Sequence, residues 1–83
     1  MQSASRFNHG AYQRPSGWYA HRWRHGEILP TKFWARHYWL LDYGLFALSP
    51  PPYGYVWVRD GDDALLIDQR TGAIVEVVYG VFY

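Results

Sequence analysis

The sequence predicts an α+β fold that is mostly β: a small antiparallel sheet with a three-stranded C-terminal meander, one or two short helical turns and a flexible N-terminal tail. The meander is predicted by three runs between residues 55 and 79 that are rich in Val, Ile, Leu and aromatic side chains. The steps Asp60-Gly61 and Thr71-Gly72 between these runs place glycine where a hairpin loop needs a positive φ. A single helix over the last two runs is the alternative, which the intervening glycine disfavours.

The length of 83 residues predicts one domain, which we divide into a flexible tail at 1–17 and a folded domain at 18–83. The tail mixes Ser, Gln, Asn, Gly and Pro, a composition typical of poorly ordered termini. The chain has no cysteine, so neither a disulfide nor a thiolate metal site stabilises its small core. Five Trp, eight Tyr and four Phe take that role, unless some of these rings instead form a surface for ligand stacking.

The elements before the meander are predicted from local patterns. Aromatic, basic and His residues interleave at 18–25, either as an extended element or as a helix. Residues 30–38 fit a short helical turn, 37–43 a buried strand, and 44–48 a second short turn. The three prolines within 49–54 form a rigid connection into the meander, because proline fixes φ and donates no backbone hydrogen bond.

Alternation within the meander divides its side chains between two faces. One face carries polar interruptions at Arg59, Asp68 and Glu76, and the other is fully apolar. We expect the apolar face to cover the core, with the N-terminal aromatic residues packed on it, and the polar face to be solvated.

The formal net charge of +1 is unevenly distributed, since residues 1–41 carry about +5 and residues 42–83 about −4. We expect the two halves to pack together and to pair their charges at the surface. Nucleic-acid binding is disfavoured because the acidic half would repel phosphate. No run reaches the roughly 18–20 apolar residues of a membrane helix, so we expect no transmembrane segment.

Catalytic motifs find little support in the sequence. No Gly-x-Ser-x-Gly elbow and no glycine-rich phosphate loop is present. The run Asp60-Gly61-Asp62-Asp63 lacks the ligand spacing and the final Glu of an EF-hand, so we interpret it as a turn. We therefore expect that the protein is not an enzyme.

Histidine residues are the candidate metal ligands, because imidazole suits nickel and related transition metals. His21 and His25 form the best pair, and His9 in the tail could close onto them. Glu27 is a possible oxygen ligand. The alternative is that these are ordinary surface histidines of an aromatic-rich segment.

Seven short pieces from about Trp23 to Tyr83 occur together in an order that resembles the RcnB family. The pieces are Gly26-Glu27-Ile28-Leu29-Pro30, Tyr38-Trp39-Leu40-Leu41-Asp42-Tyr43, Leu45 with Pro50-Pro51-Pro52, Gly54-Tyr55-Val56-Trp57, Asp63-Ala64-Leu65-Leu66-Ile67-Asp68, Thr71-Gly72-Ala73-Ile74 and Gly80-Val81-Phe82-Tyr83. Members of this family are small periplasmic proteins of Gram-negative bacteria that are tied to nickel and cobalt homeostasis.

The resemblance implies a periplasmic protein whose signal peptide has been removed, with Met1 at the position of the removed signal. It implies an accessory role in nickel or cobalt homeostasis, by weak metal binding or by modulating metal efflux. The implied partners are a nickel or cobalt ion and a metal-efflux system. The alternative function is a periplasmic protein-interaction module, which would engage a partner or a second copy of itself through an exposed strand edge or through the segment around Trp18 and Trp23.

Overall fold

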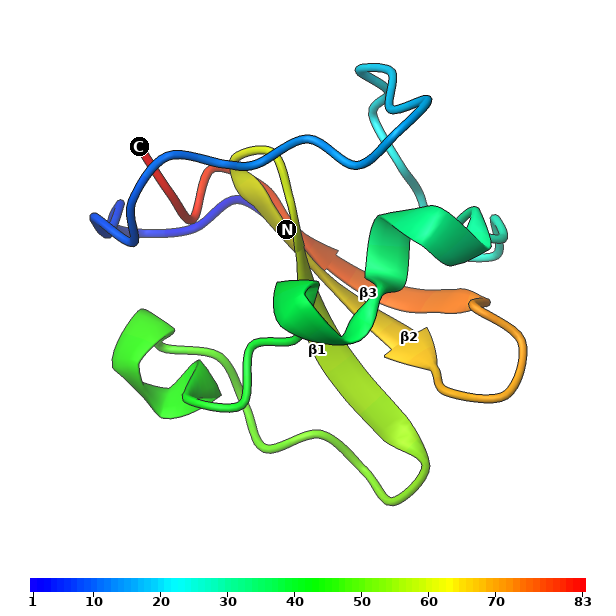
Figure 1. Cartoon of the computed structure of the whole chain (residues 1–83). Coiled ribbons are helices and arrows are strands. Elements are labelled where there is room, and N and C mark those ends of the chain that lie inside the picture. Colours follow the sequence, from blue (N-terminus) through cyan, green and yellow to red (C-terminus); the bar gives the residue numbers. More distant parts are fainter.

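The computed structural model describes residues 1–83 and contains one three-stranded antiparallel sheet and three short 3-10 helices (Figure 1). The strands are β1 (Tyr55–Asp60), β2 (Asp63–Asp68) and β3 (Ile74–Val78), in the spatial order β1-β2-β3. The helices are η1 (Thr31–Trp34), η2 (Arg36–Tyr38) and η3 (Tyr43–Phe46). This arrangement confirms the predicted fold class. No helix in the structure is long and apolar enough to cross a membrane.

Glycine closes both hairpins, as the sequence predicts. The pairing of β1 with β2 ends at Asp60 and Asp63, and Gly61 between them has a φ of 59°. Gly72 precedes β3 with a φ of 80°, and a Cβ there would lie 2.9 Å from Leu29 O. Position 72 therefore requires glycine for space as well as for backbone conformation.

A β-bulge in β3 corrects the predicted assignment of one strand to the two faces. Leu66 pairs with Glu76 but Ile67 pairs with Ile74, which leaves Val75 as an extra residue. Ile74 is thereby placed on the opposite face from Glu76 and joins the apolar core. The alternation rule gives the wrong face here, because it assumes that each residue of β3 pairs with one residue of β2.

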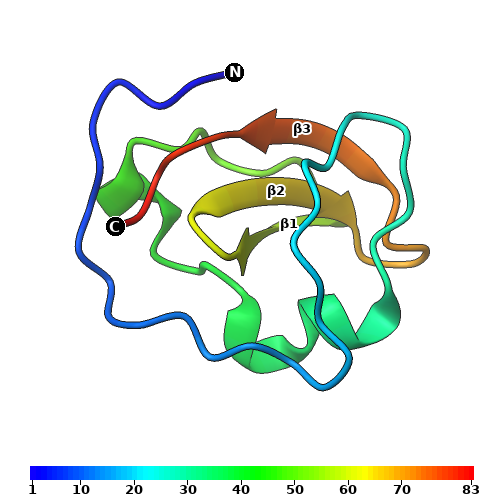
Figure 2. The ribbon, with the colours of Figure 1, turned by 90° about the horizontal axis from the view of Figure 1, so that it is seen from above.

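Both faces of the sheet are buried, which corrects the expectation of a solvated polar face. One face packs under Trp23, Leu29 and Phe33, as expected for the N-terminal aromatic residues. The other face packs under side chains that follow η2 or end the chain, namely Leu40, Phe46, Leu48, Val81 and Phe82. Figure 2 shows how the irregular segments surround the sheet. Loops with no strand pattern supply this second layer, so alternation within the strands could not reveal it.

The buried strand predicted at 37–43 does not form. η2 occupies its beginning and a turn starts at Leu41, so little extended chain is left beside β1. Only an isolated bridge between Trp39 and Val58 remains. The short turns predicted at 30–38 and 44–48 are confirmed, with η3 beginning one residue earlier than its predicted range.

Residues 1–17 contain no helix or strand, yet they lie against the domain and do not extend away from it (Figure 1). Their contacts include parallel bridges from Gln2 to Tyr79 and from Phe7 to Phe82, and a 3.0 Å hydrogen bond from the Met1 ammonium to Val77 O. These contacts use backbone groups that the chain end leaves unpaired, which composition alone does not indicate. The flexibility of residues 1–17 stays a prediction. The boundary between residues 17 and 18 stays a prediction.

Candidate functional site

His21 lies in an extended segment that is fixed by aromatic packing. Its ring centroid is 4.3 Å from that of Trp23 and 6.4 Å from that of Tyr19, so the three side chains share one face. Trp23 is only 5% exposed and belongs to the core. The segment is therefore extended and not helical, and the burial of Trp23 determines the position of the His21 ring at the surface.

Glu27 completes a close pair with His21. The Nε2 atom of His21 lies 3.1 Å from the Oε2 atom of Glu27, and both side chains are about two-fifths exposed. The Arg24 N–H donates to the Oε1 atom of Glu27 at 2.7 Å. The hydrogen bond to His21, assisted by the one from Arg24, holds the pKa of the Glu27 carboxyl below its ordinary value. The carboxylate is thus held in its charged form with one oxygen facing the imidazole.

The backbone around Glu27 is attached to the edge of the sheet. The Ile74 N–H donates to Glu27 O at 2.9 Å, and the Gly26 N–H donates to Ile74 O at 2.8 Å. These two bonds give the turn that carries Glu27 a fixed position relative to β3.

The other predicted ligands lie apart from this pair. His25 is exposed in the turn at residues 25–26 and makes no hydrogen bond. The His9 ring packs against Phe46 at 4.8 Å between centroids, and His9 lines a different hollow together with His37. No group of three or more His, Asp or Glu side chains is placed to hold a metal ion. The assignment of His9 and His25 as ligands stays a prediction.

A polar hollow of about 480 Å³ lies beside His21, where the basic and acidic halves of the chain meet. Its charged walls are Arg6, Arg14, Arg22, Asp60, Asp62 and Asp63. The Nη1 atom of Arg6 is 3.7 Å from the Oδ2 atom of Asp62. The guanidinium of Arg22 lies 3.8 Å from the centroid of the Tyr79 ring. One ion pair, between Arg6 and Asp62, therefore joins the basic and acidic halves of the chain at this hollow.

Asp60 forms the buried end of this hollow and is only 3% exposed. The Trp18 Nε1–H donates to its Oδ1 atom at 2.8 Å. Burial raises the pKa of the Asp60 carboxyl, and the charge of Asp63 raises it further, against the opposing effect of the Trp18 hydrogen bond. The sequence predicts Asp60 only as a turn residue, since nothing in that run indicates an indole donor 42 positions away.

Arg59, like Asp60, is a candidate functional residue that the sequence does not single out. In the sequence it is only one of the polar residues on an otherwise apolar face of the meander. It is 6% exposed and has no carboxylate within ion-pair distance. Its Nε–H donates to Gly61 O at 2.8 Å, and its Nη1–H donates to Gly10 O at 2.9 Å. Burial lowers the pKa of the Arg59 guanidinium, which indicates incomplete compensation of its charge.

Comparison with known protein families identifies one match. The model of the RcnB family, described as "Nickel/cobalt transporter regulator", matches residues 26–76, which is more than half of the chain. Neither a curated protein nor a solved structure matches. The matched range contains Glu27, β1 and β2, whereas His9, His21 and His25 precede it.

Proposed function

The chain belongs to the RcnB family of nickel/cobalt transporter regulators, and from this membership we propose that it is a periplasmic accessory protein of nickel and cobalt homeostasis. The family match over residues 26–76 is the observation that carries this proposal. Because the family is described as a regulator of a transporter, we propose a metal-efflux system as the partner and no catalytic activity for the chain itself.

The proposed mechanism is weak, reversible binding of the metal by His21 and Glu27. Two ligand atoms that each lie about 2.1 Å from a metal at a right angle are about 3.0 Å apart. The observed separation of 3.1 Å between Nε2 and Oε2 is close to this value, so a bound ion would replace the hydrogen bond between the two side chains. With at most three protein ligands, water would fill the other positions, which favours release to a partner over storage.

His25 is the proposed third ligand. It is exposed, makes no hydrogen bond and lies two residues before Glu27 in the same turn region. His9 is less well supported, because its ring would have to leave its contacts with Phe46 and Phe82 to reach the pair.

Titration calorimetry with Ni²⁺ and Co²⁺ tests the assigned pair. We expect wild type and His37→Ala to give the same heat, and His21→Ala and Glu27→Gln to bind at least tenfold more weakly. Glu27→Gln is the sharper variant, because glutamine keeps an acceptor for the Arg24 N–H while losing the charge. No heat in wild type, or equal heat in all four proteins, would refute the site.

The periplasmic location is tested separately by fractionating cells that express the natural gene with a C-terminal tag. Recovery of the protein with a periplasmic marker is the expected result. Recovery with a cytoplasmic marker would refute the location while leaving the metal site open to the calorimetric test.

The alternative of a protein-interaction module has less support from the geometry. The Leu40 N–H donates to Trp57 O at the outer edge of β1, and Ile74 at the outer edge of β3 bonds the turn around Glu27. Trp23 is in the core and the Trp18 indole is bonded to Asp60. Both features on which the alternative depends are therefore engaged within the molecule.

A further inference from the structure

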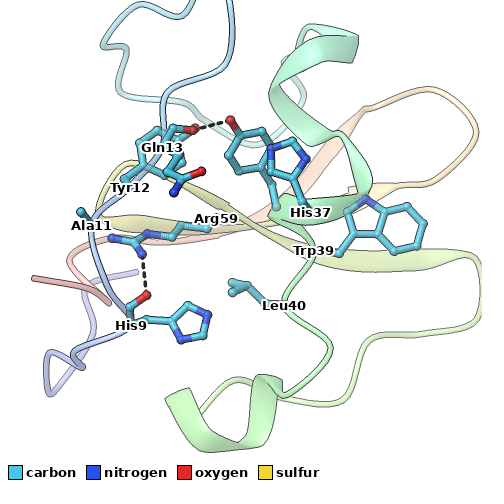
Figure 3. A pocket seen from close by; sticks show the side chains of 9 residues that line it. His9, Ala11, Tyr12, Gln13, His37, Trp39, Leu40 and Arg59 are labelled. Atoms are coloured by element: carbon cyan, nitrogen blue, oxygen red, sulfur yellow. Dashed lines mark hydrogen bonds between the residues drawn. The ribbon is translucent and has the colours of Figure 1, made fainter.

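A second hollow, of about 170 Å³, lies where residues 9–13 pass the segment 37–40 (Figure 3). Its polar side chains come from His9, Gln13, His37 and Arg59, together with two tyrosines. No aspartate or glutamate lines it. The hollow therefore presents hydrogen-bond donors and a positive charge, with no carboxylate to balance them.

Arg59 carries that charge at the inner wall of the hollow. The three hydrogen bonds of its guanidinium come from Nε and Nη1 and end on the neutral carbonyl oxygens of Gly61, Gly10 and His9. The Nη2 atom has no protein acceptor. Buried charges in proteins are normally paired with an opposite charge, so a side chain that is 6% exposed and lacks such a partner is unusual.

The carboxylate of Asp62 does not remove this imbalance. Asp62 acts on Arg59 through space and raises its pKa, yet it forms no ion pair with it. Asp62 lies instead 3.7 Å from Arg6 and is exposed to solvent, where its charge is screened. The phenyl ring of Phe82, 4.6 Å from the Arg59 guanidinium, contributes a cation–π contact but no negative charge.

Two imidazoles complete the donor set. Figure 3 shows His9 and His37 on two sides of the hollow and the Arg59 guanidinium on a third. The Tyr38 hydroxyl donates to Gln13 O, which fixes the two walls relative to each other. The potential donors thus come from three separate segments that line the same hollow.

We propose that this hollow binds a small oxyanion, a carboxylate or a phosphate, through the Nη2 atom of Arg59 and the imidazole N–H groups of His9 and His37. Arginine is well suited to these anions because its planar donors match their oxygen atoms. A metal ion is disfavoured here because the guanidinium charge repels a cation. The volume is below the roughly 300–1,000 Å³ of pockets for larger ligands, which restricts the proposal to small anions.

The test is an NMR titration of the metal-free protein with sodium phosphate and with sodium acetate, at constant ionic strength set by chloride. We expect saturable shifts of the amide signals of residues 9–13 and 37–40 with one or both anions, and none with chloride alone. The anion that binds more tightly identifies the class. Because the titration contains no metal, its outcome is independent of the nickel and cobalt proposal.

Matched variants connect the shifts to the named side chains. His9→Ala/His37→Ala should bind the anion at least tenfold more weakly, and both positions are exposed, so the fold should persist. Lys32→Ala removes an exposed positive charge outside the hollow and should bind as wild type does. Shifts that do not saturate, that appear equally with chloride, or that are unchanged in the double variant would overturn the proposal.

Discussion

Arg59 and Asp60 are adjacent charged residues on β1 that are both almost fully buried. Successive side chains of a strand point to opposite faces, so these two groups do not neutralise each other. Arg59 is held by carbonyl oxygens, and Asp60 by the indole of Trp18. The meander is predicted correctly from the sequence. The environments of the two charged side chains are not predictable, because Gly10 and Trp18 come from distant, irregular segments.

The Asp60 carboxyl gives a pH-dependent prediction. Its folded-state pKa is raised, chiefly by burial, so the native state binds more protons than the unfolded state between the ordinary value of 3.8 and the raised value. Wild type should therefore lose free energy of unfolding from this group as the pH rises through that window. Asp60→Asn keeps an Oδ1 acceptor for Trp18 and removes the charge, so its stability relative to wild type should increase over the same window.

Urea unfolding of both proteins between pH 4 and neutral pH measures this difference. The quantity compared is the free energy of unfolding of Asp60→Asn minus that of wild type, which should increase with pH. A constant value would show that the Asp60 carboxyl does not cause the pH dependence. A value that decreases with rising pH would show that the pKa of Asp60 is lowered and not raised. The carboxyls of Glu27 and Asp68, whose pKa values are lowered, contribute equally to both curves and cancel.

The candidate metal site was predictable from the sequence only in part. His21 stands in an interleaved aromatic pattern that the sequence displays, and Glu27 was recognised as a possible oxygen ligand. The distance between them was not predictable, because it depends on the turn at residues 24–27 and its attachment to Ile74. The hollow between His9 and His37 could not be predicted either, since it depends on the packing of the N-terminal segment.

At the scale of the elements, turn chemistry predicted the hairpins well, because a loop of glycine and polar residues is a local signal. Two predictions were wrong for a common reason: the strand at 37–43 and the face of the sheet assigned to Ile74. Each depends on how a segment meets its neighbour, through η2 in one case and through the bulge at Val75 in the other.

Gly72 provides the prediction that belongs to the elements. A Cβ at this position would lie 2.9 Å from both Leu29 O and Trp34 Nε1, which connect the second hairpin to η1. Gly10 has nearly the same positive φ, 79° against 80°, but nothing within 4 Å of its Cβ position. Gly10→Ala is therefore a matched control for backbone strain alone, with a cost of roughly 1–2 kcal/mol.

We expect Gly72→Ala to cost about 1–3 kcal/mol more than this control, because the overpacking adds to the strain. Chemical unfolding of the two variants beside wild type measures the difference. Equal costs would show that the contact between η1 and the second hairpin is loose, contrary to the packing described here.

At the scale of the whole molecule, the N-terminal segment functions as part of the second layer of the core. Phe7 pairs with Phe82, which is fully buried, and the carbonyl oxygens of His9 and Gly10 accept hydrogen bonds from Arg59. Composition indicates a tail, because Ser, Gln, Asn, Gly and Pro make up just over half of the segment and its few large apolar residues are widely spaced.

Deletion of residues 1–13 tests this role. We expect the melting temperature to fall by about 10 °C or more, which for a domain of this size corresponds to roughly 2 kcal/mol. The reason is that the deletion exposes Phe82 and leaves the Arg59 guanidinium without two of its acceptors. An unchanged melting temperature would support the free tail predicted from composition.

The central proposal is that this RcnB-family chain binds nickel or cobalt at the surface pair of His21 and Glu27. Titration of ¹⁵N-labelled protein with paramagnetic Co²⁺ locates the ion directly, because amide signals close to it broaden or shift first. We predict that the signals of residues 20–28 and of Ile74 are affected at the lowest cobalt concentrations, and that Glu27→Gln reduces this effect at least tenfold. Broadening that begins around His9 and His37, or no selective change at any concentration, would contradict the account.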